Sequence, residues 1–217
     1  MSEYMSYYSS INRHPFQWVS DMLKYEINSN KISSSIILSF SKYKYIPQSF
    51  SDQRVSFGLP LYQLNEMSLF NIISDLGEGE ELAIHSIVSD IGREFHIPLI
   101  DFGNKDMSVI DSSPLKELSN HWGMTFQIYS SGRSYHAYGN RLLSTPDWIK
   151  FMGSLLLLNK PGVYKLIDDR WIGHRILAGY AALRWSNNSS HYKKIPSRVG
   201  FLNPNGLLLE TTNHRLF

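Results

Sequence analysis

The sequence of 217 residues contains no cysteine. This absence excludes disulfide bonds, zinc sites built on thiolates, and a cysteine nucleophile. The chain also lacks any apolar run near the roughly 20 residues needed to cross a bilayer, so we expect no membrane partner. It lacks a strong charge of one sign, because its net charge is only +2. The net charge therefore gives no indication that the protein binds nucleic acid, although a local basic groove is compatible with it.

The polar N-terminal stretch lacks the apolar segment of a signal peptide. Together with the absence of cysteine, which fits a reducing compartment, this favours a cytoplasmic protein. Hydrophobic residues make up 42% and charged residues 18%, as in folded globular proteins. At this length we expect one domain covering residues 1–217. We divide it into an N-terminal part of helix and strand, 1–80, and a core, 81–200, that carries the motifs.

Local signals for helices and strands are mixed along the chain. Apolar periodicity, capping residues and first-turn prolines predict helices at 15–27, 67–76, 113–123 and 145–159. Short apolar runs predict strands at 33–40, 81–90, 95–102, 124–130, 134–140, 163–168 and 181–186. Tight hairpins imply antiparallel pairs. The expected class is α+β: a single domain with one largely antiparallel sheet flanked by helices.

The most specific text is a hairpin in which a Ser-x-His strand follows a Ser-Gly-Arg turn. Alternate residues of a strand share a face, so Ser134 and His136 are expected to point the same way, next to Arg133 in the turn. A hydroxyl, an imidazole and a guanidinium so placed can bind phosphate oxygens. The alternative is a surface hairpin with ordinary polar residues, and the segment alone does not decide between the two.

Two acids follow apolar runs on either side of this hairpin: Asp101 ends "HIPLID" and Asp168 ends "VYKLID". We expect both to converge with His136 in one cleft, where the carboxylates could hold Mg²⁺ or Mn²⁺ together with a triphosphate. Asp169 would face away from Asp168 if the strand continued, but it is kept as a further candidate ligand. The alternatives are that Asp101 starts a turn, and that Asp168 and Asp169 are the N-cap and first-turn acid of a helix.

The order apolar-apolar-Asp, Ser-x-His, apolar-apolar-Asp resembles that of the archaeo-eukaryotic primase superfamily, which includes the primase-polymerases. Within it, "SSGRSYHAYGN" and "DDRWIGHRILAGYAALRWS" are similar to the bacterial "primase 1D-like" proteins, and the resemblance covers residues 82–200. It implies an RRM-like core and a metal-dependent nucleotidyltransferase that acts on nucleoside triphosphates and a DNA or RNA template. The resemblance assigns metal ligation to Asp101 and Asp168, nucleotide binding to Ser134 and His136, and phosphate or template contacts to Arg175 and Arg184.

One position departs from the family pattern. The family usually has a second acid two residues after the first, where this chain has Gly103. A glycine offers no oxygen to a second metal ion, so an acid restored at this position is expected to raise activity unless the backbone needs a positive φ. The alternative function is a catalytically impaired nucleotide- or nucleic-acid-binding module within a larger complex. A role in replication would need protein partners such as a helicase or a nuclease.

An aromatic-basic stretch, "SKYKY", lies outside the resemblance. Its Tyr43 and Tyr45, beside lysines, could stack the bases of a single strand. The simpler interpretation is an exposed strand whose lysines guard the edge of a sheet.

Overall fold

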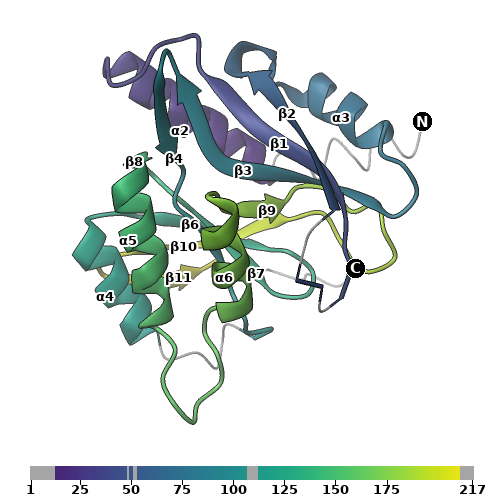
Figure 1. Cartoon of the computed structure of the whole chain (residues 1–217). Helices are drawn as coiled ribbons and strands as arrows, with labels where there is room; N and C mark the ends of the chain where they lie inside the picture. Colours follow the sequence, from purple (N-terminus) through teal and green to yellow (C-terminus); the bar gives the residue numbers. More distant parts are fainter. Residues whose placement is uncertain (1–12, 48, 51–52, 107–111, 211–217) are drawn as a thin grey trace, which may run out of the picture.

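The computed structural model describes residues 13–47, 49–50, 53–106 and 112–210, so the ends of the expected domain, 1–12 and 211–217, lie outside the described residues. The strands form two antiparallel sheets (Figure 1). In the first sheet the order is β2-β1-β3-β4-β8, and β9 also pairs with β3. Its strands are β1 (Ile37–Lys44), β2 (Gln53–Pro60), β3 (Glu80–Asp90), β4 (Arg93–His96), β8 (Leu143–Ser144) and β9 (Ala182–Arg184).

The second sheet has the order β11-β10-β6-β7-β5. Its strands are β5 (Leu99–Asp101), β6 (Phe126–Ser130), β7 (Tyr135–Gly139), β10 (Ser197–Asn203) and β11 (Gly206–Leu209). The helices are α2 (Pro15–Asn28), the 3-10 helix η1 (Leu61–Gln63), α3 (Glu66–Ser74), α4 (Ser113–Trp122), α5 (Thr145–Leu156) and α6 (Asp169–Ala178). Figure 1 shows α2 and α3 beside the first sheet, and α4, α5 and α6 beside the second.

One apolar cluster connects the two sheets. It includes Phe40 and Leu82 from the first sheet, Tyr138 from the second, and Trp148 from α5, all of them buried. The predicted class, an α+β single domain with antiparallel pairing, is confirmed. The strands are divided between two sheets, however, where the sequence analysis expects one.

The chain passes from the first sheet to the second at Pro98. The sequence predicts one strand over 95–102, but β4 ends at His96 and β5 begins at Leu99. Proline has no N–H to donate to a strand ladder, which favours a break at this point. The crossing moves Asp101, the last residue of β5, onto the second sheet beside β7.

The strand predicted at 163–168 does not form, and the structure shows there only an isolated bridge at Ile167. The side chain of Asn159 takes the place of a strand partner. Its Oδ1 accepts the N–H of Ile167 at 2.9 Å, and its Nδ2 donates to the Ile167 carbonyl at 3.0 Å. The segment is therefore a connector, and Asp168 becomes the N-cap of α6.

The end of α4 and the start of α5 lie close to the positions that the local sequence signals predict. α4 ends at Gly123, which has a left-handed φ of 55°. Ser144 caps α5, because its side chain accepts the N–H of Asp147. Strands β6 and β7 form the expected hairpin. In the described ranges no helix is both long and apolar enough to cross a bilayer.

Candidate functional site

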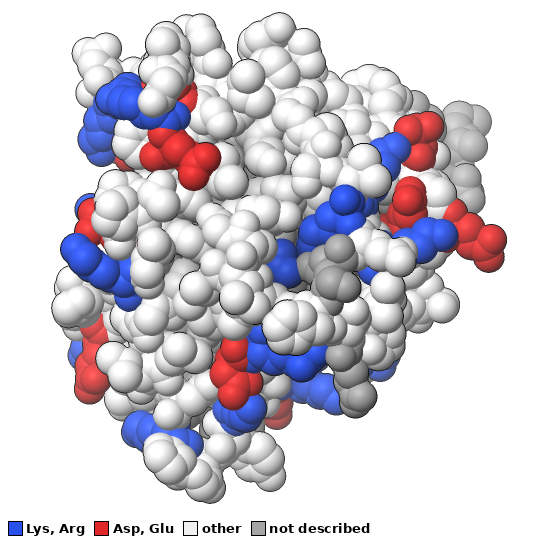
Figure 2. All heavy atoms as spheres, in the orientation of Figure 1, with Lys and Arg blue, Asp and Glu red and all other residues white. Residues whose placement is uncertain are grey.

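A cavity of about 340 Å³ opens where both sheets meet α6. The residues around it include Asp101, Gly103, Ser134, His136, Asp168, Arg175 and Arg184, with Arg54, Lys105, Arg133 and Arg170. Figure 2 shows lysine and arginine side chains gathered around a hollow on this face of the molecule. Segments far apart in the sequence thus contribute acids and cations to one cavity.

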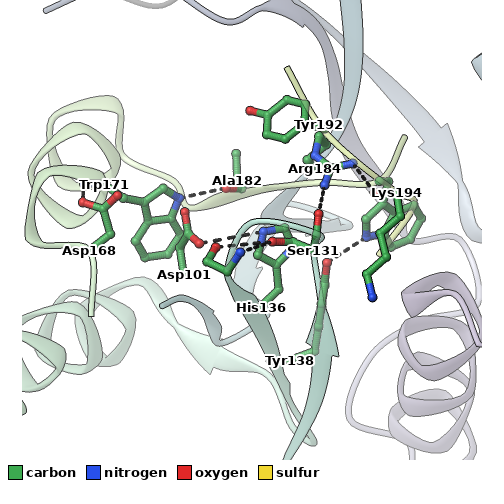
Figure 3. Close-up of polar contacts among 12 residues, drawn as sticks. Asp101, Ser131, His136, Tyr138, Asp168, Trp171, Ala182, Arg184, Tyr192 and Lys194 are labelled. Atoms are coloured by element: carbon green, nitrogen blue, oxygen red, sulfur yellow. Dashed lines mark hydrogen bonds and ion pairs between the residues drawn. The ribbon is translucent and has the colours of Figure 1, made fainter. Parts of the chain in front are cut away.

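Asp101 and His136 are paired across neighbouring strands. They are direct partners in the antiparallel register of β5 and β7. The Oδ1 of Asp101 lies 3.8 Å from the Nε2 of His136 (Figure 3). Strand pairing therefore sets the relative position of this carboxylate and imidazole.

Asp168 reaches the same cavity from the start of α6. Its Oδ1 accepts the N–H of Trp171 at 3.0 Å, which makes it the N-cap. Its own N–H donates to the carbonyl of Asp101 at 3.1 Å, so the backbones of the two acids are joined directly. The helix-cap interpretation and the cavity interpretation of Asp168 therefore both hold.

The carboxyl group of Asp101 has a raised pKa. Burial, and then the charge of Asp168, raise the pKa of Asp101 to about 8, against the opposing effect of Arg184 and Arg175. The side chain of Asp101 keeps 23% of its surface exposed, toward the cavity. A bound cation would favour the ionised form of both acids.

Two carboxylates, those of Asp101 and Asp168, are the acidic groups among the described residues of the cavity lining. Within the described ranges, no group of three or more His, Asp or Glu side chains is arranged to hold a metal ion. Mg²⁺ is commonly held by one or two protein carboxylates, while waters and substrate phosphates supply its other oxygens. Asp101 and Asp168 are the residues that could supply such carboxylates.

His136 is a buried, neutral imidazole, with 6% of its surface exposed. Burial, and to a lesser extent the charge of Arg184, lower the pKa of His136 to about 3. Its Nδ1 has no hydrogen-bond partner among the residues that the structure describes. A neutral imidazole carries one N–H, so His136 can donate one hydrogen bond without adding charge.

Ser134 lies in the turn before β7 rather than in the strand itself. Its N–H donates to the Oγ of Ser131 at 3.3 Å, and its carbonyl accepts the N–H of Ser131 at 2.9 Å. Ser134, Arg133 and His136 all line the cavity. Arg133 is exposed, and its Nη1 donates to the ring of His191. The turn therefore presents a hydroxyl and a guanidinium close to His136.

Arg184 ties together the loops around the cavity. Its Nη groups donate to the carbonyls of Ser131, Ser186 and Lys194, and only 3% of the residue is exposed (Figure 3). These bonds commit much of its donor capacity to the backbone, although its charge still acts on Asp101 and His136. Arg175 is also buried in the wall, with its guanidinium 5.9 Å from the centroid of the Tyr180 ring.

Asp169, the further candidate ligand, is not brought into this cluster. Its side chain forms an ion pair with the Nζ of Lys165 at 2.6 Å. The hydrogen bond from Lys165 holds the pKa of Asp169 below its usual value. Asp169 is not among the described residues that line the cavity. Of the two consecutive acids, only Asp168 faces the cavity.

Gly103 lies at a close approach of two backbones. A Cβ at this position would lie 3.2 Å from the carbonyl carbon and oxygen of Ile167, and 3.3 Å from the nitrogen of Asp168. The Gly103 N–H also donates to the Leu166 carbonyl at 3.1 Å. The obstacle to a side chain is this contact rather than a positive φ. An acid restored at this position would therefore push on the segment that places Asp168, contrary to the sequence-based expectation.

Sequence reasoning missed several residues of the cavity wall. Arg54, on β2, lies with its guanidinium carbon 4.3 Å from the centroid of the Tyr43 ring, and both residues line the cavity. The "SKYKY" stretch contains a signal for Tyr43. Arg54 has no comparable local signal, because only the pairing of β1 with β2 brings it to this place.

Comparison with a family model identifies the family of this chain. A family model described as archaeo-eukaryotic primase 1D-like matches residues 60–197, which is more than half of the chain. The matched range contains both acids and the Ser-x-His hairpin. No curated protein and no solved structure matches the chain. The predicted resemblance is confirmed: the chain belongs to the archaeo-eukaryotic primase 1D-like family. Membership of this family indicates, in general terms, a primase-like nucleotidyltransferase.

Proposed function

We propose that this protein is a metal-dependent nucleotidyltransferase of primase or polymerase type, which joins nucleoside triphosphates on a DNA or RNA template. One observation carries the proposal: Asp101, His136 and Asp168 line a single cavity together with several arginines. Carboxylates attract a divalent cation, whereas arginine and imidazole groups complement phosphate oxygens. A cavity of such mixed charge suits a metal–triphosphate unit better than a neutral ligand.

Asp101 and Asp168 would hold one Mg²⁺ or Mn²⁺ ion. When bound, this ion supplies positive charge that stabilises the charge developing on phosphate oxygens during transfer. The protein keeps its two ligands in place by different means. Asp101 is held by the pairing of β5 with β7, and Asp168 by the start of α6.

Other side chains of the wall would bind the nucleotide itself. His136 can donate its single N–H to a phosphate oxygen, and the Ser134 hydroxyl can donate a second hydrogen bond. Arg175 and the exposed Arg133 add positive charge. Arg184 acts mainly by fixing the surrounding loops, because its Nη groups donate to backbone carbonyls.

The test of catalysis is incorporation of labelled nucleotide on single-stranded and primed templates, with Mg²⁺ and with Mn²⁺. Asp101→Asn and Asp168→Asn should each reduce synthesis on the order of 10²-fold or more, because an amide lacks the charge of a carboxylate. Asparagine caps helices as well as aspartate does, so Asp168→Asn should still fold. The matched control is Asp169→Asn, since Asp169 is paired with Lys165 outside the cavity. Synthesis that persists in both variants would contradict the proposal.

The test of nucleotide binding is calorimetry on His136→Ala. A hydrogen bond to a charged phosphate contributes roughly 1.5–3 kcal/mol, so the affinity for nucleoside triphosphate should fall about 10- to 150-fold. Unchanged affinity in a variant with an intact melting temperature would remove His136 from the site.

A second candidate function is a nucleotide- or nucleic-acid-binding module that does not synthesise and acts within a larger complex. It is favoured by Gly103 and by the presence of only two facing carboxylates in the described part of the cavity. Wild-type protein that binds nucleotide but incorporates none with either metal would support this function. Synthesis that Asp101→Asn abolishes would exclude it.

A further inference from the structure

An aromatic platform, formed by Tyr45, His191 and Tyr192, lies at the cavity. The rings of Tyr45 and His191 are stacked, with centroids 4.2 Å apart and planes inclined by 27°. Tyr192 meets His191 edge-on at 4.7 Å and Tyr45 at 6.4 Å. Tyr45 follows β1, whereas the other two residues belong to the loop after β9, so the platform joins two distant segments.

Buried groups hold the platform in place. The guanidinium carbon of Arg184 lies 4.0 Å from the centroid of the Tyr192 ring (Figure 3). The hydroxyls of Tyr43 and Tyr192 are 3.4 Å apart. The buried carboxylate of Glu81 accepts the N–H of Asn188 at 3.0 Å, which fixes the loop that precedes His191. The rings are therefore positioned before any ligand arrives.

Tyr45 is the outer ring of the platform. It is 46% exposed, although one of its faces is stacked on His191. Nearly half of the residue's surface therefore remains accessible to another flat group. His191 accepts a hydrogen bond from Arg133, and burial with the nearby arginines lowers the pKa of His191. The stacked pair thus provides an uncharged aromatic surface beside an exposed guanidinium.

A basic strip, formed by Arg133, Lys193 and Lys194, continues from the platform. All three residues are exposed. The two lysines lie against the turn at Gly132, where a Cβ would be 3.0 Å from the Lys194 Cγ and 3.5 Å from the Lys193 Cβ. Arg133 lines the cavity, but the two lysines are not among its described lining residues. Positive charge therefore extends beyond the described lining of the cavity.

We propose that the aromatic platform and the basic strip bind single-stranded nucleic acid, with one base stacked on Tyr45 and neighbouring phosphates on the strip. The inference rests on the proposed function, because the bound strand would be the template for nucleotide transfer in the cavity. An aromatic ring beside a line of cations binds single strands with little regard to sequence, because every unpaired base offers a flat face. A duplex keeps those faces stacked on one another. Tyr45, which would stack the base, lies outside the range that the family model matches, whereas the other residues of the platform and the strip lie within it.

The experiment measures fluorescence anisotropy of labelled single-stranded DNA and RNA 20-mers with the full chain, without nucleotide or metal. Tyr45→Ala should weaken binding about 5- to 150-fold, the range for the loss of one stacked base, whereas Tyr45→Phe should stay close to wild type. Replacing both Lys193 and Lys194 by alanine should reduce the slope of log affinity against log salt by about 1.4, or about 0.7 for each lost phosphate contact.

Matched controls lie elsewhere on the surface. Tyr62→Ala removes a tyrosine that is 76% exposed on η1, and Lys116→Ala removes an exposed lysine of α4. Neither position is among the described residues that line the cavity. Both variants should bind the strand as wild type does.

Nucleoside triphosphate binding is measured in parallel with the same variants. Equal strand affinity of wild type and Tyr45→Ala would overturn this inference but leave the proposed function standing. Strand binding that depends on Tyr45, in a protein that binds no triphosphate, would support the strand site and contradict the proposed function. If Tyr45→Ala weakens triphosphate binding and leaves the strand unaffected, the platform serves the nucleotide and the inference is wrong.

Discussion

Gly103 connects the chemistry of the cavity to its backbone. From the sequence, it is a missing second acid. In the structure, it is the point where the end of β5 approaches the segment before α6, and a Cβ would come within 3.2 Å of Ile167. The same contact positions Asp168. The glycine at position 103 thus both removes a carboxylate that the family usually has and permits the close approach of the two backbones.

We expect Gly103→Ala to destabilise the protein, because the added carbon must displace backbone atoms. Overpacking of this kind costs about 1–3 kcal/mol. The matched control is Gly173→Ala in α6, where an added Cβ would meet no atom within 4 Å. Alanine at a helical position should stabilise by about 0.5–1 kcal/mol. Urea unfolding of both variants is the measurement, and equal stability of Gly103→Ala and wild type would contradict the close approach.

At the scale of elements, His96 joins β4 to α5. Its Nδ1 lies 2.9 Å from the Ser86 Oγ, its Nε2 lies 3.3 Å from the Thr145 Oγ1, and its ring stacks on Trp148 at 4.5 Å. Burial lowers the pKa of His96 to about 4, so the folded protein keeps this imidazole neutral in mildly acidic solution. The carboxylate of Glu94, 3.4 Å from Nε2, is the acidic group beside it.

This junction should make stability depend on pH. The unfolded chain takes up a proton near about pH 6.5, whereas folded His96 does so only near about 4. The contribution of His96 is therefore present above about pH 6.5 and is lost as the pH falls toward about 4. Between about pH 7.5 and about pH 5.5 the expected loss is about 1.3 kcal/mol.

The measurement compares urea unfolding of wild type and His96→Gln at those two pH values. Groups common to both proteins, such as Asp101, cancel in the difference. Glutamine does not titrate at this position, so between the two pH values the free energy of unfolding of His96→Gln should fall by about 1.3 kcal/mol less than that of wild type. Equal losses would show that folded His96 accepts a proton as readily as the unfolded chain does.

At the scale of the whole molecule, the cavity is shared by both sheets and α6. A ligand there contacts elements from both sheets, so its binding should stabilise the entire fold. At a free concentration about 100 times its Kd, a ligand adds about 2.7 kcal/mol. For a chain of this size, that corresponds to a rise in melting temperature of about 5–10 °C.

The measurement is thermal unfolding with Mn²⁺, with nucleoside triphosphate, and with both together. We expect the largest shift with both, because carboxylates and arginines would then be engaged at once. In Asp101→Asn the part of the shift that requires Mn²⁺ should disappear. An identical shift in wild type and Asp101→Asn would contradict the assignment of Asp101 as a metal ligand.

Where an element depends on its own residues, the sequence predicts it well. Pro114 and Gly123 delimit α4, and the turn containing Gly132 connects β6 to β7. These signals act within a few residues, through backbone conformation and local hydrogen bonds. The strand predicted at 163–168 fails for the opposite reason. Its apolar pattern suits a strand, but the side chain of Asn159, in the segment after α5, takes the hydrogen bonds that a neighbouring strand would have made.

Some residues of the candidate site could likewise be predicted from the sequence, whereas others depend on the fold. The order of Asp101, Ser134, His136 and Asp168 along the chain predicts both the family and the residues that meet in one cavity. Strand alternation in the sequence predicts that Asp169 faces away from Asp168, but the physical cause is different: the start of α6 and the pairing of Asp169 with Lys165 decide which acid faces inward. The resemblance to the family singles out Arg184 as a phosphate or template contact, but the sequence does not show its hydrogen bonds to backbone carbonyls.

Local patterns and motif order suffice to predict the α+β class, the main helix ends, the central hairpin and the family. The division into two sheets, the close approach at Gly103 and the meeting of Tyr45 with His191 could not be predicted in this way. Each of these is a contact between segments distant in sequence. Such contacts are settled when the whole chain buries its apolar surface and satisfies its backbone hydrogen bonds together, and no short stretch of sequence records that outcome.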